Sequence, residues 1–167
     1  MFRVTVWHSP MGPLTLAARG DQLVAVRFGD EREQAERFVH RQEPAAVIVE
    51  HRDPAGAVTA LHDYFGGDLG AVDRLQVEFY GTEFQRCVWT ALRTIPAGRT
   101  ASYSDIANAI GAPTATRAVG AANGANPIPI VVPCHRIIGT SGALVGYGGG
   151  LDRKRWLLEH EGVLLKM

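Results

Sequence analysis

Two cysteines, Cys87 and Cys134, are all that the 167-residue sequence contains. Two are too few for a disulfide framework, and they do not form the CxxC pairs of a zinc site. The six histidines include no HExxH motif. We therefore expect no metal and no cofactor, and free thiols of this kind suit a reducing compartment.

Long apolar stretches are also missing. A membrane-spanning helix needs a run of about 18 or more apolar residues, and none occurs. The first residues, Met1 to Thr5, lack the charged and apolar regions of a signal peptide. We expect a soluble, cytoplasmic protein that does not bind membranes, and its length fits one large domain or two small ones.

Positive charge is scarce in the first half of the sequence and concentrated in the second. Residues 1–85 hold 8 arginines and 13 acidic residues, a balance of −5. Residues 86–167 hold 9 basic and 4 acidic residues, a balance of +5. The second half could bind a polyanion such as nucleic acid, or the imbalance could be only a solvated surface.

The first half has the pattern of a small α+β domain. Apolar residues alternate around residues 2–6, 14–17 and 23–28 with turn residues between them, which predicts three antiparallel strands. An amphipathic helix is expected from residue 30 or 31 to 42, then a short strand at 47–49. Asp53 followed by Pro54 is typical of a helix start, and Gly66 ends that helix. Residues 68–80 are interpreted as a linker with one strand.

The second half is predicted to be helical. Thr82 can cap a helix with one apolar stripe, in which we interpret Cys87 as a core residue. A short helix from residue 102 or 103 to 110, a glycine-containing turn and a third helix over 114–124 indicate a helix-turn-helix. The third helix carries small residues and one long side chain, Arg117. Such a surface suits close helix packing or a nucleic-acid groove, and both interpretations remain open.

Cys134 stands at a corner of an apolar run. Val131 and Val132 are expected to form a buried strand, and Pro133 restricts the backbone just before the thiol. A lone buried cysteine is usually a small apolar residue. Here His135 and Arg136 follow directly, and cationic neighbours lower a thiol pKa, so Cys134 is a candidate nucleophile.

A carboxylate near the C-terminus completes a candidate relay. Asp152 is expected to cap a last helix, and Glu161 follows that helix as the late acid able to orient His135. A cysteine, a histidine and an acid form the smallest arrangement that activates a thiol at neutral pH. The glycines of residues 146–150 expose backbone amides that could bind a ligand oxygen, although such a run is usually only a loop.

Five sequence blocks together resemble the O6-alkylguanine-DNA alkyltransferase family. They are Pro133–Arg136, Asn126–Ile130, Arg117–Gly120, Gly146–Tyr147 and His160–Gly162. The resemblance covers nearly the whole chain. It implies an α+β protein with a ribonuclease H-like α/β domain over residues 1–76, built on an antiparallel sheet. A mostly helical domain with a winged-helix-like helix-turn-helix is implied over residues 77–167.

The same resemblance implies direct-reversal DNA repair. Cys134 would take the alkyl group of O6-alkylguanine, with O4-alkylthymine as a further substrate left open, once and irreversibly. His135 would remove the thiol proton through a water, and Glu161 would orient His135. Tyr103 would donate a proton toward guanine N3, and Asn126 would brace the turn beside the thiol.

Double-stranded DNA carrying the lesion is the implied partner. A flipped base would enter from the minor groove, with Arg117 in its place in the duplex. The implied DNA-binding residues are Arg117, Thr114, Ala118, Ala121, Asn123 and Arg136. The implied base pocket consists of Tyr103, Cys134, Ile137, Tyr147 and Gly148. We expect a monomer that is nucleoid-associated when it acts, and cooperative binding along DNA stays open.

Three other functions compete with this one. An alkyltransferase-like protein binds alkylated bases without accepting the group, because it lacks the cysteine that is present here. A cysteine hydrolase would need an oxyanion hole and turnover. A transcriptional regulator would need side chains for base readout, which the third helix mostly lacks. Two positions, Ala125 and Gly148, differ from many family members, and only the first is expected to alter a phosphate contact.

Overall fold

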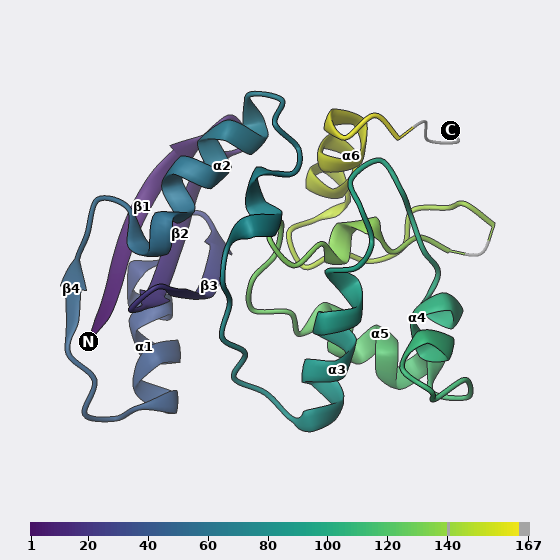
Figure 1. Ribbon diagram of the computed structural model, residues 1–167, viewed down its shortest axis with the longest axis horizontal. Helices are drawn as coiled ribbons and strands as arrows, with labels where there is room; N and C mark the ends of the chain where they lie inside the picture. Colours follow the sequence, from purple (N-terminus) through teal and green to yellow (C-terminus); the bar gives the residue numbers. More distant parts are fainter. Residues whose placement is uncertain (140, 164–167) are drawn as a thin grey trace. The chain divides into compact units, whose positions relative to one another are not determined.

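A computed structural model describes residues 1–139 and 141–163 of the chain (Figure 1). The chain divides into two compact units, and the boundary along the sequence lies between Tyr80 and Gly81. The boundary expected from the sequence lies earlier, between residues 76 and 77. The difference arises because Leu23 holds the following segment: its N–H donates to the Gln76 carbonyl at 2.9 Å, and its carbonyl accepts from Glu78 N–H at 3.0 Å.

The first unit is built on a four-stranded sheet in the order β3-β2-β1-β4. Its strands are β1 (Phe2–Ser9), β2 (Gly12–Arg19), β3 (Gln22–Phe28) and β4 (Ile48–Glu50). The three predicted antiparallel strands are confirmed, but β4 pairs parallel with β1. The sheet is therefore mixed rather than antiparallel. A parallel neighbour requires a crossover connection, and helix α1 (Arg32–Gln42) supplies it between β3 and β4.

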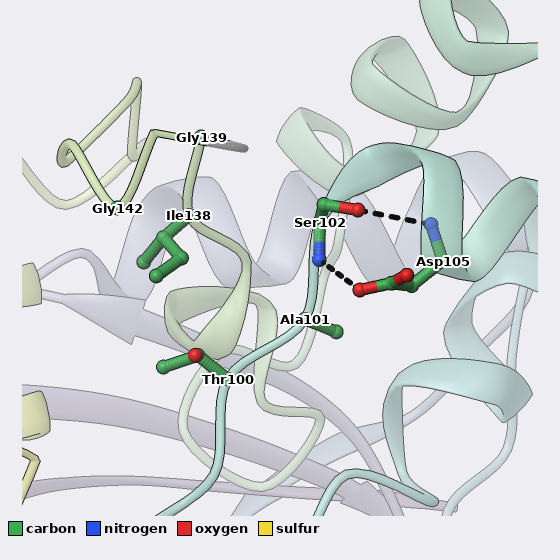
Figure 2. Close-up of a pocket in the computed structure, with 7 residues that line it drawn as sticks. All are labelled: Thr100, Ala101, Ser102, Asp105, Ile138, Gly139 and Gly142. Atoms are coloured by element: carbon green, nitrogen blue, oxygen red, sulfur yellow. Dashed lines mark hydrogen bonds between the residues drawn. The ribbon is translucent and has the colours of Figure 1, made fainter.

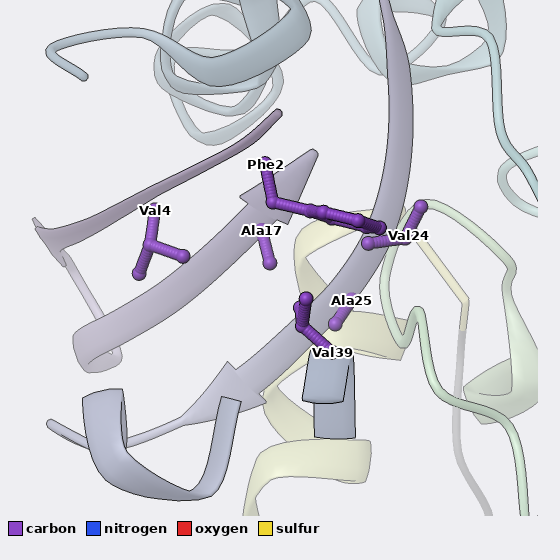
Figure 3. Close-up of a cluster of buried hydrophobic side chains, with 6 residues drawn as sticks. All are labelled: Phe2, Val4, Ala17, Val24, Ala25 and Val39. Carbon is purple, nitrogen blue, oxygen red and sulfur yellow. The ribbon is translucent and has the colours of Figure 1, made fainter. Parts of the chain in front are cut away.

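Alternation along the strands places the apolar core of this unit. Phe2 and Val4 point to the same face of β1 because successive side chains of a strand alternate. Figure 3 shows these two residues with the rest of the buried cluster, namely Ala17, Val24, Ala25 and Val39. Val39 comes from α1, so the amphipathic face predicted for this helix packs on the sheet.

The second helix of the unit starts later than predicted. Helix α2 spans Ala57–Phe65 and follows a 3₁₀ turn, η1 (Pro54–Gly56). Asp53 still acts as the cap: its Oδ1 accepts from Val58 N–H at 2.7 Å and its Oδ2 from the Thr59 hydroxyl at 2.6 Å. Ala55 has a φ of 54°, outside the helical region, which is why the helix cannot begin at Pro54. A further 3₁₀ turn, η2 (Ala71–Arg74), lies in the predicted linker.

The second unit is helical, as predicted. Its elements are α3 (Glu83–Leu92), α4 (Tyr103–Ala109), α5 (Thr116–Gly124), η3 (Cys134–Arg136) and α6 (Leu151–His160). Thr82 and Gln85 form a reciprocal capping box at the start of α3. Helix α5 packs against both α3 and α4, and Trp89 Nε1 of α3 donates to the Ala122 carbonyl of α5 at 2.8 Å. The helix-turn-helix of α4 and α5 is thus fixed to a third helix.

Three local predictions in this unit were wrong. Cys87 is exposed, because Val88, Trp89 and Leu92 define the buried stripe of α3 and Cys87 lies on its other face. Helix α5 starts at Thr116 rather than residue 114. Asp152 lies inside the first turn of α6, whose N-cap is Gly150. No helix among the described residues combines the length and apolar character of a membrane span.

Candidate active site

Residues 126–133 form a buried turn, not the strand expected from Val131 and Val132. The Asn126 side chain closes it at both ends: Nδ2 donates to the Val132 carbonyl at 2.8 Å, and Oδ1 accepts from Ile128 N–H at 3.0 Å. Ile130 has a φ of 73°, a left-handed conformation that costs about 1–3 kcal/mol for such a residue. Asn126 and the burial of Ile130 hold this strained turn in place.

Cys134 begins the single 3₁₀ turn η3 directly after Pro133. Cys134 is 5% exposed. Burial raises the pKa of the thiol to about 11, while a hydrogen bond from Asn126 and the charge of Lys154 act to lower it. The thiol is therefore protonated at neutral pH until a base or a nearby charge assists it.

His135 and Arg136 both bind Glu161, which lies at the end of α6. His135 Nε2 is 2.8 Å from Glu161 Oε2. Arg136 donates from Nε to Oε1 and from Nη2 to Oε2, both at 2.9 Å, and from Nη1 to the Ile95 carbonyl at 2.6 Å. All three side chains are at most 2% exposed. Burial alone would raise the pKa of Glu161, but the hydrogen bonds from His135 and Arg136 hold it at about 2.

The imidazole of His135 is set up as a neutral base. Burial lowers its pKa below the usual value, against the opposing effect of Glu161. Because Nε2 contacts a carboxylate, we assign the ring hydrogen to Nε2. Nδ1 is then an acceptor, and it is buried with no hydrogen-bond partner in the described part of the chain. A proton arriving at Nδ1 would be stabilised by Glu161 on the other side of the ring.

Lys154 is a buried cation at the same site. It is 0% exposed, and Nζ donates to the Val145 carbonyl at 2.7 Å. Burial lowers the pKa of Lys154 to about 8, and Cys134 is the only group in the described residues that favours its charged form. A thiolate at Cys134 is therefore the natural counter-charge for this ammonium group.

Lys154→Met should move the reaction of Cys134 with iodoacetamide to higher pH. Burial raises the pKa of the Cys134 thiol and the charge of Lys154 lowers it. Without that charge the thiol pKa rises, and the thiolate fraction at any given pH falls. We expect a shift of about one pH unit or more. The rate is measured against pH in a Cys87→Ser background, because Cys87 is exposed. Arg155→Met, one position along α6, should leave the profile unchanged, and an equal shift there would contradict the assignment.

Two sets of local hydrogen bonds fix the position of Tyr103. Ser102 and Asp105 form a capping box, whose two hydrogen bonds Figure 2 shows. Tyr103 follows as the first residue of α4. Just before it, Ala101 N–H donates to the Arg136 carbonyl, and the Ala101 carbonyl accepts from Ile138 N–H, both at 2.9 Å. This link, which borders a pocket of about 270 Å³, ties the start of α4 to the turn that holds the thiol.

The Tyr103 side chain faces α5. Its ring lies next to Gly120, where an added Cβ would sit 3.7 Å from Cε1. Burial raises the pKa of Tyr103, and the charge of Cys134 raises it further. The hydroxyl is therefore protonated at neutral pH and shares an electrostatic environment with the thiol.

One face of the helix-turn-helix is open to solvent. The exposed residues on it are Thr114, in the turn before α5, and Arg117, Ala118 and Ala121 of α5. The spacing of three and four from Ala118 and Arg117 to Ala121 places these three on one side of the helix. Two other predicted DNA-binding residues do not share this face. Asn123 is 5% exposed and Arg136 is 1% exposed, and both contact the Cys134 turn or Glu161 instead. Neither side chain therefore lies on the exposed face.

The remaining predicted pocket residues come from two segments. Ile137 is fully buried directly after η3. Tyr147 is half-buried and Gly148 is exposed in the loop before α6, which Lys154 anchors at Val145 and Arg153 anchors at Gly149. A Cβ added to Gly148 would meet no atom within 4 Å, so a larger residue fits there. Lys154 thus binds this loop through Val145 and interacts electrostatically with Cys134.

Sequence reasoning missed the role of Lys154, although a signal was present. Lys154 precedes Leu157, Leu158 and Glu161 by three, four and seven residues. This spacing puts it on the buried face of α6. No group of three His, Cys, Asp or Glu side chains is arranged to hold a metal within residues 1–139 and 141–163.

Two family models match the chain, one for each unit. Residues 2–79 match the model described as "6-O-methylguanine DNA methyltransferase, ribonuclease-like domain". Residues 83–163 match the model described as "6-O-methylguanine DNA methyltransferase, DNA binding domain". Together they span nearly all of the chain.

Relatives match over similar lengths. A methylated-DNA–protein-cysteine methyltransferase of Mycobacterium tuberculosis is 51% identical over 153 residues, which are 92% of this chain and 88% of the relative. A crystal structure of the M. tuberculosis O6-methylguanine methyltransferase is similar with a TM-score of 0.79 and 46% identity, covering 96% of this chain and 93% of that one. A structure of the same organism's protein in complex with DNA gives a TM-score of 0.74 at 46% identity, covering 96% and 91%.

Proposed function

Because the chain belongs to the 6-O-methylguanine DNA methyltransferase family, it acts in direct-reversal DNA repair as a methylated-DNA–protein-cysteine methyltransferase, and we propose that Cys134 is the acceptor. The observation that carries this assignment is the position of Cys134 next to His135, whose Nε2 lies 2.8 Å from Glu161. This is a thiol with a held base beside it. The alternative, a lesion-binding protein without transfer, is not favoured, since the acceptor position holds a cysteine.

The reaction is a direct displacement. His135 Nδ1 takes the thiol proton through a bridging water, and the Cys134 sulfur attacks the alkyl carbon. The new S–C bond forms as the bond from that carbon to O6 breaks. Lys154 stabilises the thiolate before attack. Because the thioether is stable, each molecule accepts one group and is then spent.

Tyr103 protonates the departing base. Its pKa is raised, so it holds a proton to give toward guanine N3. A base leaving as an anion in a dry pocket would be costly, and this proton lets it depart neutral. Tyr103 then regains a proton from solvent or from His135. Tyr103, Cys134, Ile137, Tyr147 and Gly148 would enclose the base, with Asn126 holding the turn.

DNA is the partner of the second unit. The exposed face of Thr114, Arg117, Ala118 and Ala121 is nearly free of bulk, which suits close approach to the minor groove. Arg117 is its only long side chain and would occupy the space of the extruded base, whose unstacking costs a few kcal/mol. The balance of +5 over residues 86–167 supports phosphate contact. We propose that the protein acts as a monomer on O6-alkylguanine in duplex DNA.

Stoichiometry tests this function. Incubation with a duplex containing one O6-methylguanine should add the mass of one methylene group to the peptide that contains Cys134. Product should stop accumulating at one equivalent per protein molecule because the thioether is not reversed. Continued turnover, or a modified Cys87 with unmodified Cys134, would refute the assignment. An identical duplex with unmodified guanine is the control.

A further inference from the structure

The proposed function gives no role to Asn123, a buried side chain close to Cys134. It lies in the last turn of α5 and is 5% exposed. Its Nδ2 is 3.5 Å from the Cys134 carbonyl oxygen, at the long limit for an N–H···O bond. Its Oδ1 is buried with no hydrogen-bond partner in the described part of the chain. A buried acceptor left unpaired is unfavourable, so a donor from outside the protein is expected there.

The surroundings place this oxygen at the base pocket. Gly120 and Asn123 are three residues apart and therefore share a face of α5. Gly120 contacts the Tyr103 ring, and Asn123 contacts the residue that carries the nucleophile. The same helix face thus lies against both the proton donor and the acceptor thiol. A base between Tyr103 and Cys134 would contact this face.

The chemistry of the base identifies the missing donor. O6-alkylguanine carries no hydrogen on N1, because alkylation of O6 fixes that nitrogen as an acceptor. Its 2-amino group is therefore the only N–H donor on the base. The Asn123 amide lies beside the Cys134 carbonyl, so Oδ1 and that carbonyl are two acceptors within one side chain's reach of each other.

We propose that Asn123 is a specificity-determining residue, whose Oδ1 accepts a hydrogen bond from the 2-amino group of the extruded base while its Nδ2 steadies the Cys134 carbonyl. This inference rests on the proposed function and adds a side-chain acceptor for the base, a role that the Cys134 thiol, His135 and Tyr103 do not perform. It favours guanine lesions over alkylated thymine, which has no exocyclic amine.

The test compares two duplexes that differ by one amino group. One contains O6-methylguanine and the other 6-methoxypurine, which lacks the 2-amino group but carries the same transferable methyl. Single-turnover transfer rates are measured for the parent, Asn123→Leu and Asn123→Asp. The ratio of the two rates cancels effects on folding or on the Cys134 carbonyl, because these act on both substrates. Asn108→Leu, an exposed substitution on α4, is the matched control.

Asn123→Leu should slow transfer from O6-methylguanine by about threefold to tenfold more than transfer from 6-methoxypurine. Asn123→Asp keeps an acceptor oxygen, so its ratio should stay near that of the parent even if both rates fall. An equal loss on both duplexes, or no loss, would overturn the proposal and assign Oδ1 to a buried water. If the parent transfers from neither duplex, the proposed function falls and this inference with it.

Discussion

Cys134→Ser is expected to abolish alkyl transfer while leaving binding to DNA unchanged. A serine hydroxyl keeps the shape of the site but is a far weaker nucleophile, because His135 and Lys154 together assist a thiol that ionises much more easily than an alcohol. The exposed face of α5 does not include residue 134, so affinity for duplex DNA should be retained. Protein mass after incubation with lesion-bearing duplex, and fluorescence anisotropy with the same duplex, measure the two properties.

Cys87→Ser is the matched control for this substitution. The second cysteine of the chain is exposed on α3 and lies outside the proposed machinery, so its replacement should leave the transfer rate at the parent value. Transfer by Cys134→Ser, or its loss in Cys87→Ser, would contradict the assignment of the acceptor.

Glu161→Gln is expected to be the most destabilising conservative change in the site. It leaves Arg136 as a buried charge without its counter-charge, and breaking a buried pair in this way costs about 3–5 kcal/mol. Urea denaturation gives the free energy of unfolding. Glu159→Gln, in the exposed pair with Arg155, should cost at most about 1 kcal/mol. Similar losses for both variants would show that the network contributes little.

The acid dependence of stability follows from the same carboxylate. The pKa of Glu161 is held at about 2, below the usual value of 4.5 for a glutamate. A depressed pKa in the folded state stabilises the protein above the unfolded value, and this contribution is lost as pH falls from about 4.5 to about 2. It amounts to about 3 kcal/mol at neutral pH. The Glu161→Gln variant should therefore be less stable than the parent at neutral pH. Its free energy of unfolding should fall much less than that of the parent on acidification.

Local pattern was enough to predict most elements. Alternation identified β1, β2 and β3, and cap residues such as Thr82 marked helix starts, because both signals lie within a few residues of one another. The parallel pairing of β4 with β1 could not be predicted in this way, since it depends on where α1 returns the chain. Val131 and Val132 favour a strand by propensity, but the hydrogen bonds of Asn126 impose a turn.

The candidate site shows the same division. Cys134, His135 and Glu161 were recognisable from residue types and from the family resemblance. The burial of Arg136 was not, because the acid that binds it lies 25 residues away and an arginine beside a nucleophile in a DNA-binding domain equally fits a phosphate contact. The burial of Asn123 could not be predicted for a similar reason: a helix that contacts DNA also has an inner face, and periodicity alone does not orient it.

The link at Ala101 consists only of main-chain groups. Two hydrogen bonds, from Ala101 to the Arg136 carbonyl and from Ile138 to Ala101, connect the segment before Tyr103 with the segment after Cys134. No side chain takes part, so replacing the Ala101 methyl by another non-proline residue that fits leaves both bonds available. The spacing between Tyr103 and Cys134, which the departing guanine must match, therefore depends little on which side chains are present at the linked positions.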